Sequence, residues 1–512
     1  MESEARRRRA LLAAALLLLA LAFAFIGRAA LSADDGTEML TETLGLFVHG
    51  HFGMASPPQL VSDPFLPPFP YLHSRYGLFP SLIFVPFLAV SWPLRGVLGA
   101  AGLDAAVALA WAAGAVFASW GFLRLARVFR PDASPLWMPA FLTGTYLWAY
   151  SADSYVEPWA AGAVALAAAA LFRPAGASAF RDALVPALWW FAAGAVRSVL
   201  WDATPVLLLA AFLLARRRAD GRAFSLWILL LSCFGLAAQI LANHVFYGSA
   251  GALGTGSVAP PFFVHPLLDG FLGTTLLPGR GVLLYAPLVL ASLVAFRKLP
   301  APARVLCYGA PLVILLVVAR WVVWHSGSCW GPRHLLAVLP LLCAPAVLAP
   351  PILSRALVAL GVLLNAPGVL VSAGAFQSYA ELLTPPPGAT WPHAGGDRVS
   401  ELPVLTPLYG HAWLLSQALL PRALPAPWLA KGARETAARP TPSEFVSPWW
   451  ARRVLGLPPL RPMLPRLLLR TALGYLDRGH PAEAARAAAA SLELAPKDRD
   501  AELILREALA RR

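Results

Sequence analysis

The sequence predicts an all-α polytopic membrane protein with about eleven transmembrane helices, and three observations support this fold class. Hydrophobic residues make up 58% of the 512-residue chain and charged residues only 13%, whereas soluble domains carry roughly 25% charged residues. The apolar residues form runs of about 15 to 22, close to the roughly 20 residues that a helix needs to cross a bilayer. Arginine clusters separate these runs. Because lipid offers the backbone no hydrogen-bond partners, such runs form helices.

The N-terminal apolar run, residues 10–30, follows four arginines and fits either a signal peptide or a retained anchor. The run is long for a signal core, and Leu31, Ser32 and Ala33 make a poor small-x-small cleavage site. We therefore expect a retained anchor.

Eleven further runs are centred near residues 85, 114, 142, 165, 191, 209, 233, 288, 312, 341 and 365. If the stretch 78–94 does not cross, seventeen lysines and arginines before the tail lie inside and seven outside. If it does cross, this bias inverts beyond residue 104. The positive-inside rule therefore favours eleven spans plus one re-entrant or interfacial helix, with the N-terminus in the cytoplasm. The first outer loop, 31–104, and the tail after residue 376 then share the outer face.

The fifth and sixth spans share only residues 184–215, which is 32 residues where two crossings need about 40. Their connecting turn holds Arg197 and Asp202. We expect this turn to lie below the membrane surface, in a recessed polar cavity lined by protein.

The formal charge of +14 does not indicate nucleic acid as a partner. The basic residues stand at the ends of apolar runs and in the tail, where membrane topology places them. Three of the four cysteines fall inside apolar runs and Cys329 is alone in a loop, so we expect no disulfide and no metal cluster.

The chain after residue 376 predicts two further regions. A Pro- and Arg-rich linker covers 377–465, and a helical hairpin covers 466–512. Tyr475, Ala484 and Pro496 have the spacing of a tetratricopeptide unit, which would bind a protein partner. An ordinary hairpin packed on the membrane domain is an equally good interpretation.

Three short motifs carry polar residues on the predicted outer face. In the first loop, Asp34 and Asp35 are candidate catalytic acids, although they could also cap a helix over 37–49 and favour its dipole. The turn after the fourth run holds Asp153 and Glu157, and either acid could be an ordinary polar turn residue.

The third motif runs from Trp324 through His325 to Arg333, with Gly331 and Pro332 just before the arginine. Arg333 could extend its head group to the membrane interface. Its planar guanidinium could instead bind a phosphate through two parallel hydrogen bonds. Gly-Pro would fix the position of the arginine, because it makes a tight turn into the following helix.

These motifs, in this order and on one side, resemble GT-C fold glycosyltransferases over roughly residues 5 to 376. The similarity rests on the acid pair of the first loop, a Tyr-Gly-x-x-x-Ser-Leu sequence at 76–82, a Tyr-x-Glu-Pro turn at 155–158 and Trp-Gly-Pro-Arg at 330–333. The nearest resemblance is to bacterial relatives of the dolichyl-phosphate-mannose protein mannosyltransferases (glycosyltransferase family 39) and of the aminoarabinose lipid A transferase. The resemblance implies a GT-C-like catalytic domain over 1–376 in a bacterial inner membrane, with the tail in the periplasm.

The resemblance further implies transfer of a sugar from a polyprenyl-phosphate donor to a hydroxyl acceptor, which is a protein, a lipid or a glycan. The general base would be Asp34 or Asp35. The donor phosphate would be bound by Arg333, with Arg280, Arg197 and His325 as further candidates. Asp153 or Glu157 would orient the acceptor or hold a divalent cation. No Asp-x-Asp nucleotide-sugar signature stands in a cytoplasmic domain, which favours a lipid-linked donor.

Two other classes of function share some of these features. A transporter or lipid flippase has many spans, short helices and buried arginines, and it usually has internal repeats, which this sequence lacks. A non-catalytic membrane scaffold would explain the C-terminal hairpin and would leave the acids of the outer face without a role.

Overall fold

The structure is a computed structural model that describes residues 9, 11–15, 17–19, 21, 34–52, 78–152, 155–176, 178–247, 263–321, 324–325, 329–371, 407–419, 446, 448–458 and 462–512. Across these ranges the regular elements are helices, and one isolated antiparallel bridge joins Val371 and Val446. The all-α fold class is therefore confirmed.

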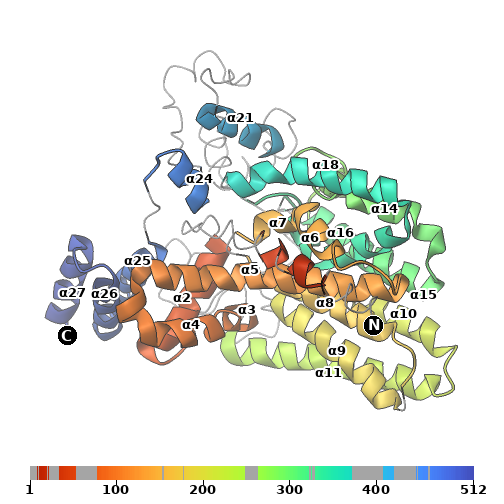
Figure 1. Ribbon diagram of the computed structural model, residues 1–512. Helices are drawn as coiled ribbons and strands as arrows, with labels where there is room; N and C mark the ends of the chain where they lie inside the picture. The colour runs from red at the N-terminus through yellow and green to blue at the C-terminus, as the bar shows by residue number, and fades with distance from the viewer. Residues whose placement is uncertain are drawn as a thin grey trace.

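The helices follow one another along the chain (Figure 1). Segments of 3-10 or π helix are named η in the text. They are α2 (Asp34–His49), α3 (Leu78–Leu82), α4 (Val85–Ser91), η2 (Trp92–Leu94), α5 (Arg95–Phe129), α6 (Trp137–Thr143), α7 (Leu147–Tyr150), α8 (Glu157–Leu171), α9 (Ala179–Val196), η3 (Ser198–Ala203), α10 (Thr204–Ala215), α11 (Gly221–Tyr247), α12 (Leu267–Thr275), α13 (Val282–Tyr285), α14 (Leu288–Val294), η5 (Phe296–Lys298), α15 (Ala301–Arg304), η6 (Val305–Gly309), α16 (Ala310–Arg320), η7 (Arg333–Val338), α17 (Leu339–Cys343), η8 (Ala344–Leu348), α18 (Pro351–Leu370), α21 (Pro407–Leu419), α24 (Trp449–Val454), α25 (Met463–Asp477), α26 (Pro481–Leu494) and α27 (Arg499–Ala510).

Five helical segments of the described chain are long and apolar enough to cross a bilayer: Leu78–Phe129, Ser198–Ala215, Gly221–Val245, Ala301–Arg320 and Pro351–Leu370. Two shorter apolar helical segments cover Glu157–Leu171 and Arg333–Leu348. These segments support a helical membrane protein, and the count of eleven spans stays a prediction.

Small residues bring the helices of the bundle close together. Helix α8 is rich in alanine and packs between α5 and α9, and α9 packs in turn on α11. A Cβ on Gly121 of α5 would lie 2.8 Å from the carbonyl oxygen of Gly162 in α8, so these two backbones are in contact. Close approach through glycine and alanine is typical of helices that associate in lipid.

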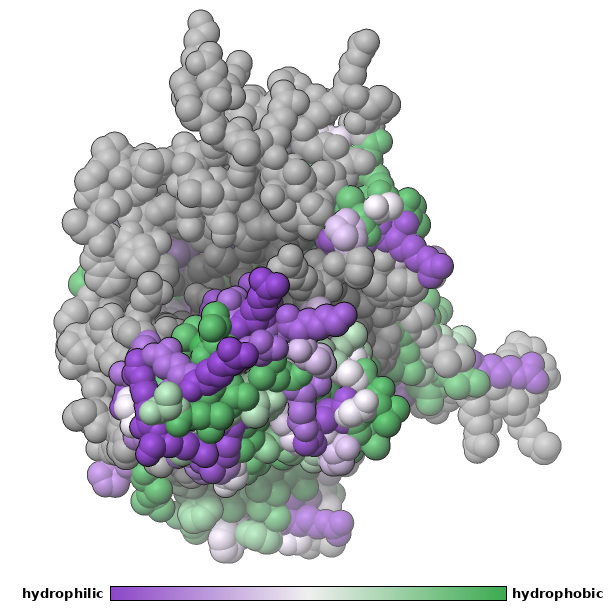
Figure 2. All heavy atoms as spheres, turned by 90° about the vertical axis from the view of Figure 1, so that its left-hand side faces the viewer, coloured by the Kyte–Doolittle hydropathy of each residue, from purple (hydrophilic) through white to green (hydrophobic). Residues whose placement is uncertain are grey.

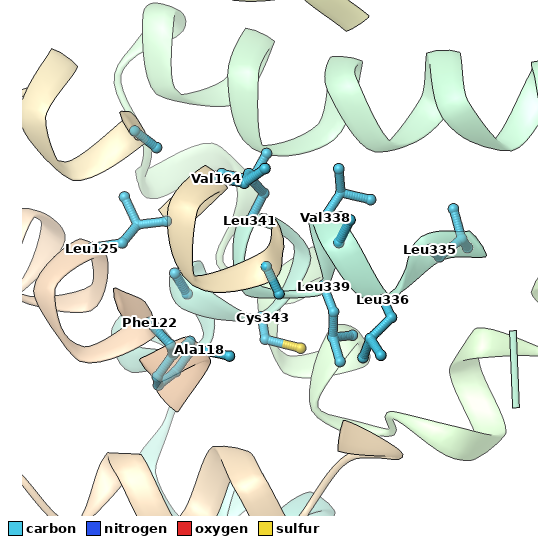
Figure 3. Close-up of a cluster of buried hydrophobic side chains, with 14 of the residues drawn as sticks. Ala118, Phe122, Leu125, Val164, Leu335, Leu336, Val338, Leu339, Leu341 and Cys343 are labelled. Carbon is cyan, nitrogen blue, oxygen red and sulfur yellow. The ribbon is translucent and has the colours of Figure 1, made fainter. Parts of the chain in front are cut away.

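The segment η7–α17–η8 crosses the centre of the bundle. Nearly all of its residues are buried, and Figure 3 shows its side chains beside those of α5 and α8. Pro340 and Pro345 interrupt its regular helix. Such interrupted helices occur at membrane depth only where protein covers them, as it does here.

The stretch 78–94, which the charge bias predicts not to cross, folds back along α5. Gly99 has a φ of +62°, a left-handed conformation that suits glycine, and it bends the chain at the start of α5. Leu88 and Trp92 consequently share one apolar cluster with Leu103 and Val107. A re-entrant position in the bilayer stays a prediction.

The sequence predicts that the turn between α9 and α10, which holds Arg197 and Asp202, lies below the membrane surface. Arg197 interrupts the two helices in an extended conformation and is 7% exposed, whereas Asp202 in η3 is exposed.

Three helices, rather than two, end the chain. Helices α25 and α26 pack on α5 and α2, and α27 packs on α25 and α26. The carboxylate of Asp104 in α5 accepts hydrogen bonds from the backbone N–H groups of Met463 and Leu464 at the start of α25. Arg95 at the start of α5 forms an ion pair of 2.7 Å with Glu493 of α26. Figure 2 looks at this end of the molecule and shows mainly polar residues over these helices, with apolar side chains between them.

Candidate functional site

A buried carboxylate lies between two buried arginines where α8 and η7 begin. Oε1 of Glu157 is 3.3 Å from Nη1 of Arg197 and 3.3 Å from Nε of Arg333. The Glu157 residue is 2% exposed. Three elements that are distant in sequence, α8, the α9–η3 break and η7, therefore meet at one charged cluster.

Local sequence explains the position of Glu157. It is the first residue of α8, and Pro158 follows it in the first turn. Proline suits that position because its fixed φ is helical and its missing N–H would have no helical partner there. The positive end of the helix dipole also favours a carboxylate at this point.

The segment before η7 is held rigidly, which fixes the position of Arg333. Gly331 has a φ of +68°, and a Cβ there would lie 3.1 Å from the ring of Tyr285. The indole N–H of Trp330 donates to Oδ1 of Asn365 at 2.9 Å, and the Trp330 carbonyl accepts from the Tyr150 hydroxyl at 3.0 Å. The guanidinium of Arg333 then stacks over the ring of Tyr155, with its Cζ 5.0 Å from the ring centre.

Two further basic residues adjoin this cluster. Nη2 of Arg197 lies 3.1 Å from Nδ1 of His334, whose ring also contacts Trp321. Arg280, which is 1% exposed, donates a hydrogen bond to the carbonyl of Cys329, four residues before Arg333. Arg280 is thus tied to the segment that carries Arg333.

Among the described residues, two guanidiniums share the single carboxylate of this cluster. One carboxylate faces two guanidiniums, so the three side chains have a formal charge of +1, and buried charges of this kind need additional partners. Oε2 of Glu157 is buried, and within the described part of the chain it accepts no hydrogen bond. The arrangement is therefore suited to an anion on the guanidiniums and to a hydroxyl donor on Oε2.

Helix α2 reaches the same region through an apolar cluster. Met39, Leu40 and Leu44 of α2 share this cluster with Val156. Val196 packs against it. Val156 and Val196 directly precede Glu157 and Arg197, so α2 lies near the charged cluster.

A second buried acid fixes α2 to α3. Glu42 is fully buried, and its Oε2 accepts a hydrogen bond of 2.6 Å from the hydroxyl of Ser81. The hydroxyl of Thr43 donates to the Ser81 carbonyl at 2.7 Å. Sequence analysis quoted Ser81 within a motif and missed Glu42. No local signal distinguishes Glu42, because it stands between Thr41 and Thr43 and looks like an acid on a helix surface.

The structure brings only some of the predicted site residues together. Arg197, Arg333 and Glu157 come together, and Arg280 adjoins them. His325 is buried beside Trp324, whose ring packs on Gly273 of α12.

The predicted acids are only partly described. Asp34 and Asp35 stand in the first turn of α2, which begins at Asp34 rather than at residue 37, and their side chains lie outside the described residues. Asp153 lies outside them altogether.

All four cysteines lie in the described chain as free thiols, and Cys329, predicted to lie in a loop, is 1% exposed. Among the described residues, no group of three or more His, Cys, Asp or Glu side chains is placed to hold a metal ion.

Comparisons with known proteins give no relative. No family model, no curated protein and no solved structure matches this chain.

Proposed function

We propose that this protein is a membrane glycosyltransferase that moves a sugar from a polyprenyl-phosphate donor to a hydroxyl acceptor. The observation that carries the proposal is the buried cluster in which Arg197 and Arg333 share the carboxylate of Glu157. A buried site that presents two guanidiniums suits a lipid-linked phosphate, because a planar guanidinium can bind two phosphate oxygens at once.

In this reaction the acceptor oxygen forms a bond to the anomeric carbon as the bond from that carbon to the phosphate oxygen breaks. The leaving phosphate takes the electron pair of the broken bond. Arg333 and Arg197 stabilise the negative charge that develops on it, and Arg280 supports the segment that holds Arg333. Because the guanidiniums are already in position, little reorganisation is needed during the reaction.

Glu157 has two roles in this scheme. Its Oε1 holds the two guanidiniums in place. Its Oε2, which accepts no hydrogen bond from the described residues, accepts one from a hydroxyl of the sugar or of the acceptor. The contacts with two cations favour this role over coordination of a divalent cation.

A carboxylate of α2 takes the proton of the acceptor hydroxyl as the new bond forms. Asp34 and Asp35 are the first candidates, and the apolar cluster that joins α2 to Val156 supports their proximity to the arginines. Glu42 serves a different purpose, since its bond to Ser81 fixes α2 on α3.

The proposal places this site on the periplasmic side of a bacterial inner membrane. The chain passes repeatedly between the end with Glu157 and the opposite end, where Arg130, Arg173, Arg216 and Arg304 stand at helix termini. The positive-inside rule assigns that opposite end to the cytoplasm. The C-terminal helices, which pack on α2, then lie in the periplasm.

The test uses purified protein in nanodiscs with three labelled hexose donors: a polyprenyl phosphate, a polyprenyl diphosphate and a nucleotide. The proposal predicts release or transfer of the label from the polyprenyl phosphate alone. Movement of intact donor across the membrane of a proteoliposome, without cleavage of the sugar, would instead identify a transporter or flippase.

A further inference from the structure

A second site lies at the opposite end of the bundle from Glu157. A cavity of about 550 Å³ opens there between α6 and the start of α18. Its lining includes Arg130, Asp132, Ser134, Trp137, Arg355 and Val358. Cavities of roughly 300 to 1,000 Å³ hold small molecules in other proteins, so this one is large enough for a ligand.

The packing of α6 against α18 explains why the cavity exists. A Cβ on Gly361 of α18 would lie 2.1 Å from the carbonyl oxygen of Gly144, directly after α6, so the two backbones touch at that level. Towards Trp137 and Pro351 no such contact closes the space, and the cavity occupies it.

The cavity is distant from the charged cluster of Glu157. Ser354 and Arg355 in the first turns of α18 line the cavity, whereas Asn365 of the same helix bonds Trp330 near Arg333. At 1.5 Å per residue, Asn365 lies roughly 16 Å further along the helix than Ser354. The cavity is therefore a separate site, and the inference drawn from it does not depend on the proposed glycosyl transfer.

The charged end of the cavity favours an anion. Arg130 is held in place because its Nη1 donates to the carbonyl of Val347 at 3.3 Å and its Nε lies 3.2 Å from Asp132. Arg355 is exposed and has no ion-pair partner among the described residues. With Asp132 counted, the ionisable side chains of the lining carry a net charge of +1. Lys298 adds a charge nearby, since its Nζ donates to the carbonyl of Leu348 at 2.7 Å.

The remainder of the cavity is apolar and opens beside a surface that suits lipid. Trp137, Val347 and Val358 form its walls. Close by, Leu136 is 53% exposed and Ile352 is 81% exposed. A largely exposed isoleucine beside a guanidinium is expected where acyl chains and head groups meet, because apolar side chains and cations then each face a matching environment.

We propose that this cavity binds an anionic glycerophospholipid of the surrounding bilayer. Arg355 and Arg130 bind the phosphodiester, and an acyl chain lies along Trp137 and the exposed face of α18. The neutral lipid phosphatidylcholine keeps the phosphate but cancels its charge with a quaternary ammonium group, so this lipid should bind more weakly. Basic pockets between transmembrane helices bind acidic head groups in this way.

Native mass spectrometry tests the proposal on the full chain, released from membranes that contain equal amounts of phosphatidylglycerol and phosphatidylcholine. The wild-type protein should retain phosphatidylglycerol in preference. Arg355→Gln should lower this retention about tenfold, because one charge-assisted contact is lost. Arg216→Gln, which removes an exposed arginine outside the cavity, should leave it unchanged.

A second pair of variants changes the shape of the cavity without changing its charge. Ala359 is exposed and lines the cavity, and Ala356 is exposed on the same helix but outside the lining. Ala359→Phe should abolish preferential retention, and Ala356→Phe should not. Because both alanines are exposed, neither substitution disturbs the packed interior.

Four results would overturn the proposal. Equal retention in Ala359→Phe and Ala356→Phe would show that lipid binds elsewhere, and equal retention of phosphatidylcholine would remove the need for a net negative charge. Complete displacement of the lipid by millimolar glycerol 3-phosphate would show that the site takes a soluble phosphate. If a polyprenyl phosphate displaces phosphatidylglycerol at equal concentration, the occupant is the carrier lipid and the proposal is wrong.

Discussion

Asp104 in α5 accepts a hydrogen bond of 3.0 Å from the backbone N–H of Leu464, which lies 360 residues further along the chain. Met463 donates to the same carboxylate. The buried carboxylate of Asp104 thus takes the place of an N-cap for α25 and holds the C-terminal helices on α5.

Asp104→Ala should weaken the attachment of α25–α27 by about 1 to 2 kcal/mol, because two N–H groups lose a charged acceptor. Hydrogen–deuterium exchange should then rise in α25 and change little in α8. Glu502→Ala removes an exposed acid of α27 and serves as the control. Unchanged exchange in α25 of the Asp104 variant would mean that the apolar contacts alone hold these helices.

Attachment of the C-terminal helices should also weaken in acid. The pKa of His49 is lowered to about 4, mainly by burial and in smaller part by the nearby Arg486 and His51, while Glu483 opposes the shift. The ring of His49 packs edge-on against Tyr475 of α25. When the helices detach, this pKa returns towards 6.5, so the detached state binds more protons between pH 6.5 and 4 and is favoured as the pH falls through that range.

The measurement is exchange in α25 between pH 7 and 4.5, corrected for intrinsic rates, in the wild-type protein and in His49→Gln. The wild-type protein should lose protection in acid, and the variant should lose less. A pH dependence of equal size in both proteins would exclude His49 as the titrating group.

Gly331→Ala should destabilise the site for two reasons that a control can separate. A left-handed φ costs a residue with a Cβ about 1 to 3 kcal/mol, and the new methyl group would also crowd Tyr285 at 3.1 Å. Gly479 has a φ of +75° with nothing within 4 Å of an added Cβ, so Gly479→Ala has the backbone cost alone. Thermal unfolding should therefore shift more for Gly331→Ala, and equal shifts would show that Tyr285 moves aside without cost.

The double variant Asp34→Asn with Asp35→Asn should lose at least about a hundredfold in sugar transfer, since a general base contributes this much or more. Binding of the polyprenyl-phosphate donor should be retained, because the arginines are untouched. Full activity in the double variant and in both single variants would exclude this pair as the base.

Sequence reasoning succeeded where a physical rule acts locally. Hydropathy and run length gave the helical membrane class, and the Gly-Pro before Arg333 identified an arginine that the structure buries in the charged cluster. Glu157 and Arg197 were proposed for different roles, and the structure joins them. Their contact depends on how α8 and α9 pack, which no local pattern encodes.

Long-range contacts explain what sequence reasoning missed. In the sequence, Asp104 looks like the polar end of a loop. Its role depends on the long-range contact with α25. In the sequence, Glu42 looks like an acid on a helix surface. Its burial depends on the long-range contact with Ser81. The packing beside the cavity between α6 and α18 depends on the contact of Gly144 with Gly361, and nothing in the local sequence marks these two glycines.

The most direct test of the proposed transferase compares Arg333→Gln with Arg320→Gln. The comparison measures initial rates of sugar transfer from a labelled polyprenyl-phosphate hexose in nanodiscs. Arg320 is an exposed arginine at the same end of the bundle, so its variant controls for lost surface charge. The account predicts a loss of about a hundredfold to a thousandfold for Arg333→Gln and a near wild-type rate for Arg320→Gln. Equal rates in the two variants would contradict a phosphate-binding role for the buried arginine and the mechanism built on it.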